Sequence, residues 1–108
     1  MMEKRKQIRY TAHAQARIPE VFDGKVLLKD ISVTGCGIES TMFMDIKLNH
    51  RYKMDIIPEE ASKIGPFEIL AEVLWIRAGG YSFEAGFAIT ASPKGKQFQR
   101  YVDYLSWR

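Results

Sequence analysis

The chain has 108 residues, of which 46% are hydrophobic and 12% aromatic. This composition suits one small domain with a buried core, and it excludes both a second domain and a disordered chain. No apolar run approaches the roughly 20 residues needed to span a bilayer. The charged start leads into no apolar segment of a secretory signal, so we expect a cytoplasmic protein without a membrane span.

The net charge of +3 is concentrated at the start of the chain. The first ten residues contain four basic side chains and one acidic one: Lys4, Arg5, Lys6, Arg9 and Glu3. Residues 11–108 therefore hold twelve charges of each sign and sum to zero. We expect a flexible basic arm over residues 1–10 and a neutral folded domain over residues 11–108. Proteins that bind long nucleic acids usually spread their basic residues over a face of the fold, so this local charge suits a small anion better.

The first half of the folded domain shows the period-two pattern of half-buried strands. Small apolar residues alternate with polar ones over 11–18, which predicts the first strand. Asp23-Gly24 predicts a hairpin turn, because both residue types tolerate positive φ. Residues 25–31 then form the second strand. Two glycines interrupt the pattern in 32–37, and residues 40–50 are irregular.

The second half predicts three further strands and one exposed loop. The strands cover residues 52–56, 67–76 and 81–90, and the loop covers 58–66, between two prolines. A glycine pair at 79–80 predicts a hairpin turn between the last two strands. Three aromatic residues at strand spacing are expected in the core: Trp75, Phe83 and Phe87.

A change of period after residue 90 predicts a terminal helix over about 92–107. Ser92 is a good N-cap, and Pro93 suits the first helical position, where its missing N–H is not needed. One face of this helix is apolar and contains Phe98, Tyr101, Val102 and Leu105. The five or six short strands and this helix predict a mainly β fold, a small six-stranded antiparallel β-barrel with a C-terminal α-helix.

The residues do not predict an enzyme. His13 and His50 are isolated and are expected on the surface. Cys36 lies between two glycines without a neighbouring cation and is expected to be a small buried residue, and Glu59-Glu60 is expected to be a solvated pair. No clustered ligands predict a metal site, and no phosphate-binding glycine loop occurs. We therefore expect a binding module without metal or cofactor.

Two short motifs stand at the start of the domain. Arg5 and Arg9 form an Arg-x-x-x-Arg pattern in the arm, and Asp30, Ser32 and Gly35 form an Asp-x-Ser-x-x-Gly pattern at the end of the second strand. Each motif alone is weak, because surface arginines are common and the second motif also describes an ordinary turn. Their order and separation make the pair informative.

These motifs resemble those of the PilZ domain, a bacterial receptor module for the second messenger cyclic di-GMP. The resemblance covers about residues 4–107 and extends to Gly86-Phe87-Ala88-Ile89 and the terminal helix. It implies a split-barrel fold, cyclic di-GMP as ligand, and binding through Arg5, Arg9 and the residues of the second motif. It also implies that Lys4, just before the arginine motif, influences whether one or two ligands bind.

The chemistry of the motif residues suits this ligand. Arginine presents a planar fork to guanine O6 and N7 or to phosphate oxygens. An ionised Asp30 accepts the N1–H and N2–H₂ donors of a guanine edge. Ser32 can donate to a phosphate or fix the turn, and Gly35 removes a side chain where the ligand approaches the backbone.

The expected mechanism is that ligand binding orders residues 1–10 over the barrel and so presents a new surface to an effector protein. Two alternatives remain open. The chain can be a small barrel that binds single-stranded nucleic acid. It can also be an interaction adaptor that reads no nucleotide, as a monomer or as a weak homodimer through Tyr101, Tyr104 and Trp107.

Overall fold

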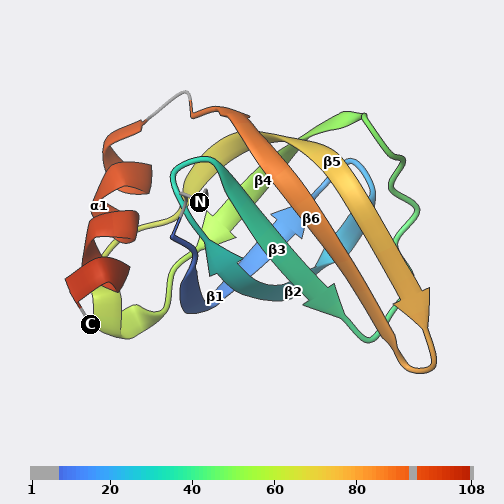
Figure 1. Cartoon of the computed structure of the whole chain (residues 1–108). Helices are drawn as coiled ribbons and strands as arrows, with labels where there is room; N and C mark the ends of the chain where they lie inside the picture. The colour runs from blue at the N-terminus through green and yellow to red at the C-terminus, as the bar shows by residue number, and fades with distance from the viewer. Residues whose placement is uncertain (1–7, 93–94, 108) are drawn as a thin grey trace, which may run out of the picture.

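The computed structural model describes residues 8–92 and 95–107, and Figure 1 shows their arrangement. The elements in chain order are β1 Tyr10–Ile18, β2 Phe22–Ile31, β3 Gly35–Ser40, β4 Arg51–Ile57, the 3₁₀ helix η1 Glu60–Ser62, β5 Phe67–Gly79, β6 Ser82–Ala91 and α1 Gly95–Trp107. Most of the predicted arm and Pro93 of the predicted helix start lie outside the described residues. No helix in the described part of the chain combines the length and the apolar character that crossing a bilayer requires.

The strands form one closed antiparallel barrel in the order β1-β2-β3-β6-β5-β4. Closure between β1 and β4 leaves the sheet without a free edge. The predicted mainly β fold, with six antiparallel strands and one C-terminal helix, is confirmed. Successive side chains on each strand point alternately into and out of the barrel. Because of this alternation, the outward residues of neighbouring strands form rows across the sheet.

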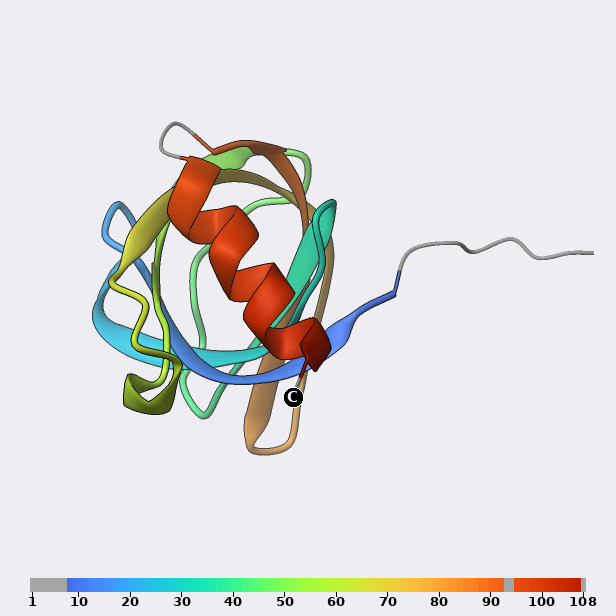
Figure 2. The same ribbon diagram turned by 90° about the vertical axis from the view of Figure 1, so that its left-hand side faces the viewer.

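The interior of the barrel is filled unequally by its strands. On β1 the inward residues are mostly alanines, and larger side chains such as Ile69, Phe83 and Phe87 come from β5 and β6. Helix α1 lies across one end of the barrel (Figure 2). Its buried residues are Phe98, Tyr101, Val102 and Leu105, which confirms the predicted apolar face. Tyr101, which we named as part of a dimer surface, is buried beneath the helix, whereas Trp107 is exposed.

The first hairpin turn lies earlier than predicted. Ile18 pairs with Phe22, and the N–H of Val21 donates to the carbonyl of Ile18 at 2.9 Å, so the chain turns over residues 19–21. The prediction of a turn at Asp23-Gly24 is wrong, since β2 already includes both residues. Pro19 explains the early turn, because it lacks the N–H that a ladder needs and has a φ suited to turns.

Strand β5 contains a bulge that reverses its predicted inner face. The register shifts between Val73 and Trp75, where Leu74 is the extra residue. Ile76 then pairs with Ala85, while Trp75 pairs with Gly86 and is 42% exposed. The expectation of a core position is confirmed for Phe83 and Phe87 and is wrong for Trp75. The sequence gives no sign of the bulge, because residues 73–76 are all apolar.

The loop over residues 58–66, which joins β4 to β5, also contacts the terminal helix. The hydroxyl of Tyr101 donates to Oε1 of Glu59 at 2.6 Å, and Oγ of Ser62 donates to the backbone carbonyl of Glu59 at 2.8 Å. Lys63 follows η1 in the left-handed conformation with φ 61° and closes the turn. Glu59 is therefore not the solvated residue that we predicted. It fixes α1 over the end of the barrel.

We predict that Tyr101→Phe lowers the free energy of unfolding by about 1–2 kcal/mol, because it removes the donor to Glu59 and keeps the packing of the ring. Urea unfolding followed by circular dichroism measures this change. Tyr104→Phe is the matched control, since Tyr104 stacks on Tyr101 and makes no hydrogen bond to a described residue. Equal losses in the two variants would show that the hydrogen bond contributes nothing of its own.

Candidate functional site

The turn between β2 and β3 is organised by the hydroxyl of Ser32. Its Oγ accepts the N–H groups of Thr34 and Gly35, each at 3.2 Å. The N–H of Ser32 donates to the carbonyl of Gly35 at 2.8 Å. Ser32 is only 2% exposed, so its hydroxyl is committed to the turn. A serine at this position therefore determines how the second predicted motif folds.

Arg9 and Asp30 meet beside this turn. Nη1 of Arg9 donates to Oδ1 of Asp30 at 2.8 Å, and the two side chains are 38% and 32% exposed. Arg9 directly precedes β1, and Asp30 pairs in register with Thr11 near the start of that strand. The antiparallel pairing of β1 with β2 thus brings together two residues 21 positions apart.

Gly35 provides the room in which Arg9 lies. A β-carbon at Gly35 would be 2.9 Å from Nη2 of Arg9 and 2.7 Å from the carbonyl oxygen of Phe87. The second of these contacts is with backbone, which cannot move aside. Any larger residue at position 35 would therefore shift both the guanidinium and the pairing of β3 with β6.

The same arrangement recurs on the next row of the sheet, where Gly37 pairs with Gly86. A β-carbon at Gly37 would be 3.2 Å from Oδ1 of Asp30, so the carboxylate lies directly above bare backbone. A β-carbon at Gly86 would collide with the pyrrole part of the Trp75 indole. The two glycines form a floor, with Asp30 over one half of it and Trp75 over the other.

An ionic cluster borders this floor. Oε1 of Glu84 accepts a hydrogen bond from Nη2 of Arg77 at 2.5 Å, and Oε2 of Glu84 lies 3.7 Å from Nζ of Lys29. The hydrogen bond from Arg77 lowers the pKa of Glu84 below its ordinary value, and the charge of Lys29 acts in the same direction. Arg77 also lies over the Trp75 ring, with Cζ 5.6 Å from the ring centroid.

The predicted site residues are thus partly accounted for. Arg9, Asp30, Ser32 and Gly35 come together at one place on the outer face, whereas Arg5 and Lys4 lie outside the described residues. The sequence analysis did not place Trp75, Gly37 or Gly86 beside the motif, because their positions depend on the bulge in β5 and on the register of β3 with β6. The sequence signal for a close approach was the glycine inside β3 and the glycine inside β6, Gly37 and Gly86.

Cys36 lies beneath this site and is fully buried. Burial raises the pKa of its thiol to about 12; the charge of Arg9 acts in the opposite direction, and the charge of Asp30 adds to the rise. A thiol that stays protonated is a poor nucleophile. The prediction that Cys36 is a small buried residue is confirmed. His13 and His50 are exposed, as predicted.

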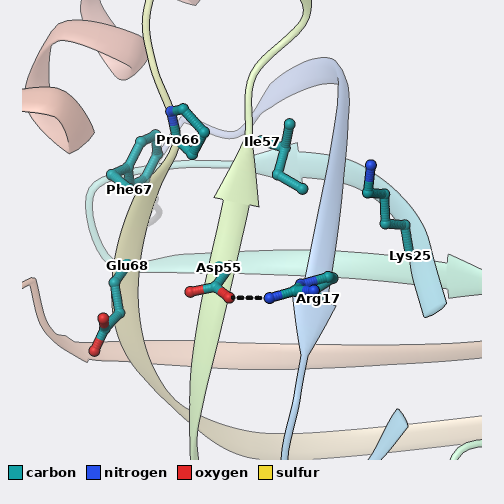
Figure 3. Close-up of a pocket in the computed structure, with 7 residues that line it drawn as sticks. All are labelled: Arg17, Lys25, Asp55, Ile57, Pro66, Phe67 and Glu68. Atoms are coloured by element: carbon teal, nitrogen blue, oxygen red, sulfur yellow. Dashed lines mark hydrogen bonds and ion pairs between the residues drawn. The ribbon is translucent and has the colours of Figure 1, made fainter. Parts of the chain in front are cut away.

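A separate hollow of about 420 Å³ lies on another part of the barrel (Figure 3). Arg17 and Asp55 point toward each other across it, with Nη2 and Oδ2 at 3.2 Å. Lys25 and Glu68 also line it, so the hollow carries two charges of each sign and offers no excess charge to an anion. The described residues contain no cluster of His, Cys, Asp and Glu that could hold a metal ion.

Comparisons with known proteins agree with this architecture. The PilZ domain family model matches residues 3–105, and no curated protein sequence gives a significant match. The inhibitor of motility MotI/DgrA of Bacillus subtilis has a TM-score of 0.71 at 16% identity, over 98% of this chain and 50% of that one. The PilZ domain of YcgR from Escherichia coli, solved with cyclic di-GMP, has a TM-score of 0.71 at 18% identity, over 97% and 93%. The TM-scores establish a shared fold with both relatives, and the chain spans half of the length of the first one.

We predict that Cys36 in the native protein resists a thiol reagent at pH 8, because its thiol is both buried and protonated well above that pH. The same reagent should label one thiol per chain in 6–8 M urea, roughly the range that unfolds small domains. Mass spectrometry of the labelled protein measures both rates. Rapid labelling without urea would show that the interior beneath the site opens easily.

Proposed function

The chain belongs to the PilZ domain family, and on this premise we propose that it is a receptor for cyclic di-GMP in the bacterial cytoplasm. The observation that carries the proposal is the half-exposed pair of Arg9 and Asp30 beside the Ser32–Gly35 turn. The YcgR relative with the same fold was solved with this ligand. In this proposal the chain acts as a binding module, without a catalytic residue or a cofactor.

The two exposed charges offer complementary groups to a guanine. The Asp30 carboxylate accepts the N1–H and N2–H₂ donors of the base, and the Arg9 fork donates to O6 and N7 or to a phosphate. In the unbound protein these groups bond to each other. A partly exposed ion pair contributes about 0–1 kcal/mol, whereas a bidentate base contact contributes about 1–3 kcal/mol. The ion pair is therefore weak enough to open for a guanine.

Ser32 and Gly35 act on the ligand through the backbone in this proposal. The Ser32 hydroxyl fixes the turn, and Gly35 leaves the space in which the Arg9 guanidinium lies. Of the two roles predicted for Ser32, its hydrogen bonds within the turn favour the structural one. Gly35 also allows close approach of a ligand once Arg9 moves, because it has no side chain of its own.

The basic arm supplies the attraction for the two phosphates. On the described face the charges of Arg9 and Asp30 cancel, and Glu84 offsets one of its two cationic neighbours. The excess of +3 within residues 1–10 includes Arg9, so residues 1–8 by themselves still hold a net charge of +2. We assign to Arg5 the second arginine contact and to Lys4 an influence on the number of bound ligands. Ligand binding then orders residues 1–10 on the barrel, and an effector protein recognises the changed surface.

A second candidate function is that of an adaptor that binds a protein and no nucleotide. The observation that favours it is the exposure of large apolar side chains, among them Phe43, Tyr81 and Trp107. Phe43 and Tyr81 line the same small hollow at the tip of the β5–β6 hairpin. None of the described motif residues lines this hollow, so an adaptor surface there and a nucleotide site are compatible.

We predict that cyclic di-GMP binds the purified protein with a Kd in the micromolar range or below, and that Arg9→Ala and Asp30→Ala each weaken binding roughly 5- to 150-fold, the equivalent of one bidentate contact. Isothermal titration calorimetry measures this change. Cyclic di-AMP should not bind comparably, because adenine lacks the N1–H and N2–H₂ donors that Asp30 accepts.

Arg17→Ala and Asp55→Ala are the matched controls for this titration. This second pair has a similar exposure, 42% and 29%, and lies in the separate hollow. Full affinity in Arg9→Ala would contradict the proposed site. Absence of heat with the wild type would favour the adaptor, whereas binding to single-stranded DNA with a steep salt dependence would favour a nucleic-acid-binding barrel.

A further inference from the structure

The hollow of Figure 3 has the dimensions of a small-molecule site. Its volume of about 420 Å³ lies within the range of roughly 300–1,000 Å³ that such sites occupy. Four charged side chains line it: Lys25, Arg17, Asp55 and Glu68. They come from the neighbouring strands β2, β1, β4 and β5 in that order around the barrel. None of the described motif residues lines this hollow, so any site here is separate from the candidate nucleotide site.

The charges of the hollow are sorted by sign. Asp55 pairs in register with Arg17 on one side and with Glu68 on the other. Lys25 lies beyond Arg17, on β2. The four charges sum to zero, yet the hollow has a positive side on β1 and β2 and a negative side on β4 and β5. A simple anion or cation is attracted by one side and repelled by the other, whereas a zwitterion matches both.

These charged groups have hydrogen-bonding capacity left over. Nη2 of Arg17 donates to Oδ2 of Asp55 at 3.2 Å, and the two side chains are 42% and 29% exposed. Arginine has five N–H donors and a carboxylate has two acceptor oxygens, so a single bond leaves most of this capacity to a ligand. Glu68 has only a loose ion pair with Lys53 at 3.7 Å. The structure gives Lys25 no ion pair with a described residue.

An apolar shelf, formed by Ile57 and Pro66, borders the charged row. Ile57 follows Asp55 by two positions and so lies on the same outer face of β4. Phe67, next to Pro66, is buried and packs against two aromatic rings of α1. The wall is therefore held in place by the core. A ligand that fits this hollow has an apolar group beside its two charges.

We propose that this hollow binds a free α-amino acid with an apolar side chain. The ligand carboxylate lies between Arg17 and Lys25, its ammonium group lies between Asp55 and Glu68, and its side chain rests on the apolar shelf. Both charged groups of an α-amino acid are attached to one carbon, so they can lie over the neighbouring Arg17 and Asp55 side chains together. The inference does not depend on the proposed function, and it gives the domain a second ligand.

The first test compares L-leucine with three probes that each lack one of its groups. Isocaproate lacks the ammonium group, isoamylamine lacks the carboxylate, and glycine lacks the side chain. We expect leucine to shift the amide NMR signals of Arg17 and Asp55 saturably, with a Kd in the millimolar range. Isocaproate and isoamylamine should bind about tenfold more weakly, because each loses its hydrogen bonds to charged groups.

Two results of this titration would overturn the inference. One is a shift that does not saturate up to the solubility limit of leucine. The other is binding of isocaproate or isoamylamine as tight as that of leucine, which would show that the order of charges is irrelevant. Equal binding of glycine would overturn the preference for an apolar side chain.

The second test changes the lining charges one at a time. Lys25→Gln should weaken leucine binding about 2- to 5-fold, on the scale of one exposed ion pair. Lys53→Gln should strengthen it, because Glu68 is then free for the ammonium group, and it should have no effect in a Glu68→Gln background. Arg51→Gln is the matched control, since Arg51 has a similar ion pair at 3.6 Å across the same two strands and does not line the hollow.

These variants separate contact with the ligand from a general effect of charge. Equal losses in Lys25→Gln and Arg51→Gln would contradict the proposed contact. A gain from Lys53→Gln that persists without Glu68 would show that charge acts at a distance, and it would contradict the contact as well. A chain that fails to bind cyclic di-GMP and binds leucine would overturn only the receptor function. The amide spectrum of each variant shows whether it is folded.

Discussion

Three glycines on the outer face of the barrel each lie beneath a side chain that a β-carbon would displace. The pairs are Arg9 over Gly35, Asp30 over Gly37 and Trp75 over Gly86. Bare backbone on β3 and β6 lets a guanidinium, a carboxylate and an indole lie close against the sheet. The closed barrel beneath is filled with buried side chains, so this surface is held in one shape. The positions of the Arg9, Asp30 and Trp75 side chains depend on this close approach.

The charges of the molecule are divided between two regions with different roles. On the described face the charged side chains form pairs: Arg9 with Asp30, and Glu84 with both Arg77 and Lys29. Such pairs are weak when exposed, so they hold the side chains in place without resisting a ligand. The net positive charge lies in the first ten residues. In the proposed receptor the face supplies recognition of the bases, and the basic segment supplies the long-range attraction for phosphates.

Much of the architecture could be predicted, because local patterns report local structure. The alternation in 11–18 and the i, i+3, i+4, i+7 spacing in α1 correctly predicted a strand and the buried face of a helix. The turn at Asp23-Gly24 was wrong, because Pro19 ends the strand before the favoured dipeptide is reached. The role of Glu59 could not be predicted, since its partner Tyr101 is 42 positions away. The sequence named Arg9 and Asp30, which the structure brings together, but it did not indicate that Trp75 lies over Gly86.

The sequence alone determined the fold class, the position of the helix, the location of the excess charge and the identity of the motif residues, since each of these follows from residue types at short spacing. The tertiary structure decided which side chains meet. Pairing of β1 with β2 places Arg9 on Asp30, and pairing of β3 with β6 aligns Gly37 with Gly86. The bulge at Leu74 turns Trp75 outward within a run of apolar residues that has no period of its own. Register and bulges depend on contacts between strands that are far apart in the sequence, and a local pattern of residues does not predict those contacts.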